Sequence, residues 1–171
     1  MSFGNFLREI FFSARRAELL LSENQEGLTS GHAARGNRRK GRELALQALY
    51  QIAITGDASA GAVDLFLEHF EGAPQAKEFA RRLVSGVVSQ TVELDRIIAE
   101  CTENWKLPRL AKVDLEIIRI ASYELIFCPD IPANVSLDEA IEIAKRFGSA
   151  ESATFINGVL DHVARSRAHQ A

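Results

Sequence analysis

The densest run of chemically active side chains in this sequence is basic and lies between residues 35 and 42. Arg35, Arg38, Arg39, Lys40 and Arg42 fall within this stretch, which contains no acidic residue. Residues 1–42 carry a net charge of +4, whereas residues 43–171 carry −7. A block of cations on an otherwise acidic chain is typical of a surface that binds a polyanion such as a nucleic acid. Composition alone also allows a second interpretation, in which the block is a solvated start of the folded domain.

Residue types that could support catalysis or metal binding are present but are not arranged for either. Neither Cys101 nor Cys128 has a second Cys or a His at metal-ligand spacing, and the four histidines are scattered. No glycine-rich phosphate loop follows a strand pattern, and neighbouring acids such as Asp138 and Glu139 are typical of a solvated helix face. We therefore predict a protein that is not an enzyme, has no cofactor and no metal, and works in a reducing cytoplasm.

The composition of the N-terminal region predicts where the folded domain that carries the basic block begins. No apolar run of about 18 residues could cross a bilayer, and Arg8, Glu9, Arg15 and Glu18 interrupt every candidate signal-peptide core. Residues 23–37 are rich in Gly, Ser and Asn and lack an apolar period, which predicts a linker. We expect residues 1–36 to be a partly disordered leader and linker, and residues 37–168 to be one folded domain without a membrane segment.

The basic block should stand at the start of the first helix of this domain. Leu44, Leu46, Leu49 and Ile52 recur at helical spacing and predict a helix over residues 39–54, with the cations on and just before its first turn. Cations at that end oppose the helix dipole by a few tenths of a kcal/mol each. An external anion would compensate for that cost.

The remaining elements that we expect are also helices. Apolar spacing predicts helices over residues 60–71 and 152–168, and either two helices or one bent helix from Pro74 onward, with the break near residues 85–91. Residues 108–126 are apolar on almost every side, which predicts a buried central helix. Ser136 and Glu139 form a capping-box pattern that predicts a helix start, and Gly148 should end that helix. Two further basic pairs, Arg81 with Arg82 and Lys145 with Arg146, carry no prediction by themselves.

Four stretches of the sequence resemble the NusB transcription antitermination family in order and separation. They are RELALQALY (residues 42–50), VDLEIIRIASYEL (113–125), VSLDEAIEIAKRFG (135–148) and FINGVLD (155–161). The resemblance covers roughly residues 37–163. It implies an all-α domain of about six to seven helices in two small bundles, preceded here by the N-terminal leader.

The resemblance also implies a function and a set of site residues. The function is to bind boxA RNA of ribosomal RNA operon leaders together with NusE, a small-subunit ribosomal protein, and to help assemble an antitermination complex on RNA polymerase with NusA and NusG. The family's RNA-binding positions fall on Arg38, Arg39, Lys40, Arg42 and Arg81. The segment between the last two helices adds Phe155 as an RNA candidate and Glu151 as a partner-binding candidate. An aromatic residue in the first turns of the last helix is more often a core residue than a base-stacking platform, and periodicity does not decide between the two for Phe155.

Two alternatives share the predicted fold. NusB-like domains also precede the catalytic domain of RNA cytosine methyltransferases, so the chain could correspond to such an accessory domain. A helical interaction protein of ribosome assembly is the other possibility. The sequence departs from the family in the roughly 36 residues that precede the basic block, and apolar leader residues such as Phe3, Phe6 and Phe11 could cover the basic face.

Overall fold

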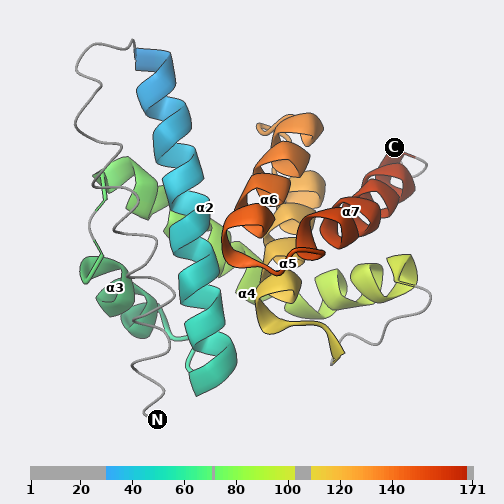
Figure 1. The fold of residues 1–171 in the computed structure, drawn as a ribbon. Coiled ribbons are helices and arrows are strands. Elements are labelled where there is room, and N and C mark those ends of the chain that lie inside the picture. The colour runs from blue at the N-terminus through green and yellow to red at the C-terminus, as the bar shows by residue number, and fades with distance from the viewer. Residues whose placement is uncertain (1–29, 71, 103–108, 169–171) are drawn as a thin grey trace. The chain divides into compact units, whose positions relative to one another are not determined.

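The structure is a computed structural model that describes residues 30–70, 72–102 and 109–168. Within these ranges every regular element is a helix and no strand occurs, which confirms the predicted all-α fold (Figure 1). The chain divides into two units, residues 1–35 and 36–171, and the account below concerns the second. The leader residues Phe3, Phe6 and Phe11 lie outside the described residues. None of the described helices is long and apolar enough to cross a membrane.

Six helices make up the described part of the chain. They are α2 (Ser30–Thr55), α3 (Ala60–Glu68), α4 (Pro74–Cys101), α5 (Lys112–Phe127), α6 (Ala133–Phe147) and α7 (Ser152–Ala168). Pro74 begins α4 and Gly148 follows the end of α6, as the sequence predicted, and the bounds of α7 match the predicted range. The predicted helix over residues 60–71 ends earlier, because a turn begins at His69.

Helix α2 begins nine residues before the predicted start at Arg39. The interpretation of residues 30–37 as linker is therefore wrong, since Ala33, Ala34 and Arg35 favour helix and offset the cost of Gly31 and Gly36. The basic block consequently lies inside the helix and not at its N-terminus. The argument that these cations oppose the helix dipole, and so need an external anion, loses its basis.

Helix α4 is one continuous helix of 28 residues, which settles the choice that the sequence left open. Near its start, the phenyl ring of Phe79 lies so close to Gly41 of α2 that a Cβ there would be 2.8 Å from the ring. In its middle, Gly86 leaves room for the Tyr123 side chain of α5, because a Cβ at this position would lie 2.0 Å from the Tyr123 ring. At its end, the Cys101 carbonyl is 3.4 Å from His162 Nδ1 of α7. Successive parts of α4 thus meet α2, α5 and α7. This helix therefore joins a small N-terminal bundle with α2 and α3 to a C-terminal bundle of α5, α6 and α7.

Helix α5 is the buried central helix of the C-terminal bundle, and it packs on α4, α6 and α7 (Figure 1). Its side chains Ile117, Ile118 and Leu125 are at most 2% exposed. The helix begins at Lys112 and not at the predicted Pro108, because Arg109–Ala111 form a short irregular turn. The continuous core of buried residues that surrounds α5 also includes the apolar side of α2, among them Leu44, Leu46 and Leu49.

Helix α6 begins at Ala133, directly after Pro132, and the predicted capping box at Ser136 is wrong. Pro132 fixes an extended residue before the helix and lacks the N–H that a first turn leaves unpaired, so it starts the helix one turn early. Ser136 therefore lies inside α6, and its hydroxyl is fully buried and donates to Glu124 of α5 at 2.8 Å. This hydrogen bond leads into the site described next.

Candidate nucleic-acid interface

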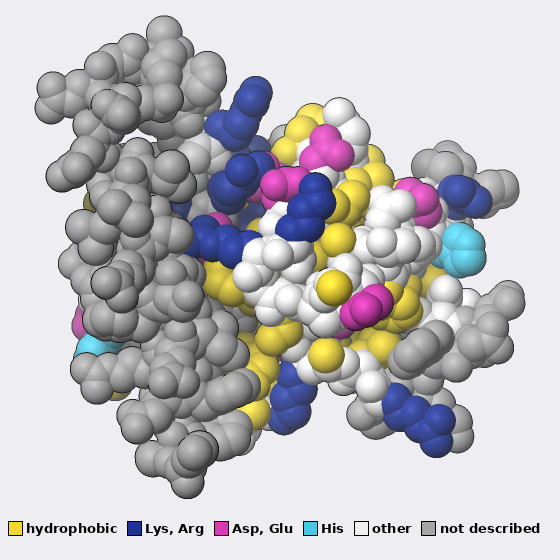
Figure 2. All heavy atoms as spheres, in the orientation of Figure 1, with side chains coloured by type: hydrophobic (Ala, Val, Ile, Leu, Met, Phe, Trp, Pro, Cys, Tyr) yellow, Lys and Arg dark blue, Asp and Glu magenta, His cyan; other side chains and the backbone are white. Residues whose placement is uncertain are grey.

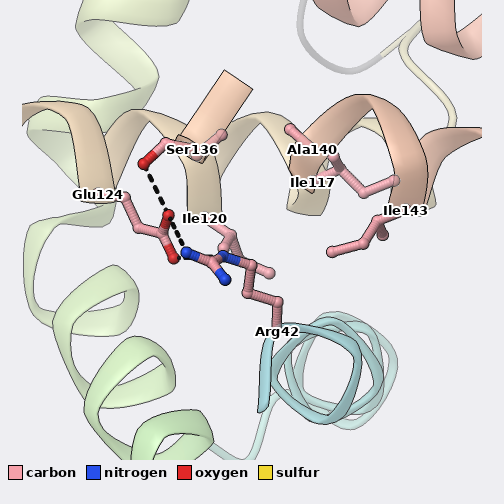
Figure 3. Close-up of a pocket in the computed structure, with 8 residues that line it drawn as sticks. Arg42, Ile117, Ile120, Glu124, Ser136, Ala140 and Ile143 are labelled. Atoms are coloured by element: carbon pink, nitrogen blue, oxygen red, sulfur yellow. Dashed lines mark hydrogen bonds and ion pairs between the residues drawn. The ribbon is translucent and has the colours of Figure 1, made fainter. Parts of the chain in front are cut away.

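Arg42, the last cation of the basic block, points into the protein core. Its Nε and Nη2 atoms donate to the two carboxylate oxygens of Glu124 at 2.8 and 3.0 Å, and the Ser136 hydroxyl donates to the same carboxylate (Figure 3). The side chains of Arg42 and Glu124 are only 3% and 1% exposed. The guanidinium also lies over the Phe79 ring, 5.3 Å from its centre. The three polar side chains thus tie α2, α5 and α6 together in the interior.

The space around this ion pair does not admit a ligand. The cavity beside Arg42 holds about 10 Å³ and is lined by Ile117, Ile120 and Ile143 (Figure 3). A single water needs at least that much space. The placement conflicts with the predicted RNA contact of Arg42, because an external phosphate could reach its guanidinium only if Glu124 were displaced. We assign Arg42 a role in holding α2 against α5.

Arg38, Arg39 and Lys40 lie on the outer side of the same helix. Arg39 donates through Nε and Nη2 to the Glu139 carboxylate of α6 at 2.9 and 2.8 Å, and this contact raises the pKa of its guanidinium. The Arg39 side chain is nevertheless 48% exposed, and the Glu139 side chain beneath it is 8% exposed. Arg38 is exposed and lies over the Phe79 ring at 5.6 Å. These three cations can face a ligand.

Helix α6 adds basic side chains that face this part of α2. Arg146 donates to Glu43 of α2 at 2.5 Å and lies 5.1 Å from the centre of the Phe147 ring, and Lys145 donates to Glu142 at 2.7 Å. Figure 2 shows Lys and Arg side chains of α2 and α6 gathered on one face, with acidic side chains between them. Lys145 and Arg146 had no predicted role. The signal that could have found them is their position in the last turn of α6, the helix that also contributes Glu139.

The other predicted site residues lie elsewhere. Arg81 of α4 donates to Asp64 of α3 at 2.6 Å and to Glu78 at 2.8 Å, and its side chain is 41% exposed. Phe155 is half-buried and packs against the core, which agrees with its interpretation as a core residue. Glu151 is exposed in the turn directly before α7 and accepts a hydrogen bond from the Ser149 hydroxyl. The hydrogen bonds of the Arg81 and Glu151 side chains thus run to Asp64, Glu78 and Ser149 and not to the cations of α2.

The remaining reactive groups do not form a second site. Burial raises the pKa of both thiols, so at neutral pH Cys101 and Cys128 stay protonated and weakly nucleophilic. In the part of the chain that the structure describes, no three His, Cys, Asp or Glu side chains are placed to hold a metal ion. The exposed cations remain the strongest candidate site.

Comparison with known proteins gives one consistent result. A family model described as the NusB family matches residues 39–165. The transcription antitermination protein NusB of Desulfatibacillum aliphaticivorans is 48% identical over 128 residues, which cover 75% of this chain and 90% of that protein. A solved structure of T. maritima NusB has 40% identity and a TM-score of 0.68, and the match covers 75% of this chain and 90% of that one.

A second solved structure shares the fold at lower identity. It is described as antitermination factors NusB and NusE in complex with dsRNA; the match has 23% identity and a TM-score of 0.68, and covers 76% of this chain and 97% of that one. At this identity the likeness concerns the fold alone.

Proposed function

Because the chain belongs to the NusB family, we propose that it is a transcription antitermination factor that binds boxA RNA of ribosomal RNA operon leaders together with a NusE-type ribosomal protein. The exposed cations of α2, namely Arg38, Arg39 and Lys40, carry the RNA contact. The protein acts by holding RNA and protein together and catalyses no reaction.

The single observation that carries the proposal is the layered arrangement of charge on α2. Glu139 and Glu43 are 8% and 5% exposed in their side chains, whereas Arg39 and Lys40 above them are 48% and 32% exposed. The carboxylates therefore face inward and hold the cations in place, and the cations face solvent. Positioned guanidinium groups suit the recognition of RNA phosphates, because little side-chain entropy is left to lose on binding.

The finer parts of the proposal rest on the family. Phe155 and Arg81 are further RNA candidates, and Glu151 is a candidate for the NusE-type partner. We propose that the complex then joins NusA, NusG and RNA polymerase in the cytoplasm. The relatives with this name match over nearly their whole length, which favours an antitermination factor over an accessory domain of an RNA cytosine methyltransferase.

The test is a titration of the full chain with a fluorescently labelled single-stranded boxA RNA at several salt concentrations. If about three or four phosphates are neutralised, log K should fall with log salt at a slope of roughly −2 to −3, since each single-strand phosphate contributes about −0.7. The double variant R38Q/R39Q should flatten this slope by about one to one and a half. Addition of a NusE-type protein should tighten binding, because one RNA can then contact two surfaces at once.

A matched control is R96Q on α4. Arg96 is similarly exposed and paired, with Glu93 and Glu100, and this variant should bind RNA like wild type. Wild type that binds no RNA with or without the NusE-type protein would contradict the proposal and favour a ribosome-assembly protein. Binding that R38Q/R39Q leaves unchanged would place the RNA site elsewhere.

A further inference from the structure

A groove between α2 and α6 lies next to the proposed RNA surface. It is lined by Arg39 and Glu43 from α2 and by Glu142, Ile143, Lys145 and Arg146 from α6, and its volume is about 300 Å³. Liquid water occupies roughly 30 Å³ per molecule, so a phosphate group and several waters fit. This groove is larger and more open than the cavity at Arg42.

We propose that the groove is a phosphate-binding extension of the RNA surface, and that Arg146 and Arg39 hold one RNA phosphate between them. The proposal rests on the proposed function and adds α6 to a site that the sequence confined to the α2 basic block, Arg81 and Phe155.

The first argument is the position of the donors. Arg39 comes from α2 and Arg146 from α6, and both line the same groove. The Nη1 group of Arg39 makes no hydrogen bond to any residue that the structure describes, because Glu139 occupies only Nε and Nη2. A phosphate in the groove can therefore accept from Arg39 without breaking its ion pair.

The second argument is the fixed orientation of Arg146. Its Nη1 atom donates to Glu43, and its guanidinium carbon lies 5.1 Å from the centre of the Phe147 ring. Glu43 also lies 4.0 Å from Lys40, so one buried carboxylate positions cations from both helices. The Arg146 side chain keeps 33% of its surface exposed.

The third argument concerns the sign of the charge that a ligand meets. Glu43, the acid paired with Arg146, is 5% exposed, and Glu139, the acid paired with Arg39, is 8% exposed. Glu142 at the rim is exposed but is paired with Lys145. A ligand that enters the groove thus meets guanidinium groups with their counterions beneath them, and an anion is the natural occupant.

The experiment compares R146Q, R146K and R39Q in the same boxA RNA titration, with R96Q as the control. R146Q should flatten the salt slope by about 0.7, the contribution of one single-strand phosphate, and should weaken binding roughly three- to tenfold at low salt. R146K keeps the charge and should retain the wild-type slope. R96Q, whose cation lies outside the groove, should match wild type in slope and affinity.

Folding effects are separated by a second variant. R146Q leaves Glu43 with fewer partners, so E43Q/R146Q removes the carboxylate as well, and it should melt close to wild type and show the same flattened slope. If R39Q flattens the slope but R146Q and E43Q/R146Q bind like wild type, the groove proposal is overturned and the proposed function stands. If R146Q weakens binding only when the NusE-type protein is present, the groove contacts the protein partner, and the proposal of an RNA phosphate is again overturned. If wild type binds no RNA, both proposals fail.

Discussion

Two arginines one helical turn apart on α2 make nearly identical ion pairs in opposite surroundings. Arg42 donates through Nε and Nη2 to Glu124 at 2.8 and 3.0 Å, and Arg39 donates through the same two atoms to Glu139 at 2.9 and 2.8 Å. The first arginine side chain is 3% exposed and the second 48%. Equal geometry therefore does not imply an equal role.

The difference in burial assigns the two arginines different roles: Arg42 stabilises the fold, and Arg39 is available for binding. A buried charge loses its hydration, so Arg42 and Glu124 depend on each other, and removal of either leaves an uncompensated ion in the core. The Arg39 guanidinium is half-exposed although its partner Glu139 is buried, so it can face a phosphate while it keeps that ion pair. The α2 helix thus uses one residue type for both the core and the surface.

The largest expected effect comes from breaking the buried pair. E124A leaves the Arg42 guanidinium unpaired in the core and also removes the acceptor of the Ser136 hydroxyl, so it should lower the free energy of unfolding by about 3 to 5 kcal/mol. Urea denaturation followed by circular dichroism measures this loss. A loss below about 1 kcal/mol would mean that the α2–α5 junction admits water and that the two regions do not differ as described.

Replacing both charges together should restore most of that stability. R42M/E124L fills a similar volume with apolar atoms, and such replacements of buried pairs are often neutral or stabilising. The same variant should keep the wild-type salt slope for boxA RNA, because Arg42 does not reach the ligand. Urea denaturation and the RNA titration check the two halves of this prediction. If the double variant is well folded but its salt slope for RNA binding is flattened, Arg42 contacts the RNA after all.

Replacing Arg39 should have the opposite effects: little change in stability and a clear change in RNA binding. R39Q keeps a side-chain amide that can donate to the buried Glu139, so it should lower the free energy of unfolding by only about 1 kcal/mol, which for a chain of this size is a shift in melting temperature of roughly 2 to 4 °C. It should nevertheless flatten the RNA salt slope by about 0.7. Thermal melting and the titration together test it, and a large melting shift with no change in slope would show that Arg39 is a structural residue as well.

The sequence predicted the helices better than the contacts between them. The bounds of α7, the Pro74 start of α4 and the Gly148 end of α6 follow from local signals that act within one turn. The capping box failed because the same residues also serve a long-range purpose: Ser136 bonds to Glu124, twelve residues earlier.

The burial of Arg42 could have been predicted from its position in the sequence, but its place in a run of cations suggested an exposed residue. Arg42 precedes Leu46 and Leu49 by four and seven residues, so it lies on the apolar stripe of α2 and not opposite it. Glu124 lies in a helix that is apolar on almost every side, where an acid needs a buried partner. Together these two patterns could have predicted an ion pair between Arg42 and Glu124. The exposed fraction of the Arg39 side chain could not be predicted, because it depends on how closely α6 approaches α2.

A third group of ion pairs, around Arg119, is intermediate in burial and extends the comparison to the effect of pH on stability. Arg119 of α5 donates to both carboxylate oxygens of Asp95 on α4 at 2.8 Å, and its Nη1 donates to Glu116 at 2.7 Å. The Arg119 side chain is 17% exposed and that of Glu116 is 4% exposed. Since Asp95 already takes two of the hydrogen bonds of Arg119, Glu116 is less well compensated, and burial raises its pKa above the ordinary value of 4.5.

The smallest predicted effect is a change of stability with pH, and its direction follows from the raised pKa of Glu116. A carboxyl group whose pKa is higher in the folded than in the unfolded protein stabilises the fold most when it is protonated, and that contribution is lost as the pH rises through the folded pKa. E116Q mimics the protonated form and still accepts the Arg119 hydrogen bond, so its melting temperature relative to wild type should increase as the pH rises from about 4.5 to 7.

The control has the opposite sign. The hydrogen bond from Arg82 lowers the pKa of the exposed Asp130 below its ordinary value of 3.8, so the deficit in melting temperature of D130N relative to wild type should grow only at the acid end of a pH series from 3 to 7, and should stay constant above it. Melting curves of wild type, E116Q and D130N across that series measure both trends. If E116Q fell relative to wild type as the pH rose, the charged carboxylate would be the stabilising form, and Arg119 would compensate the buried Glu116 charge in full.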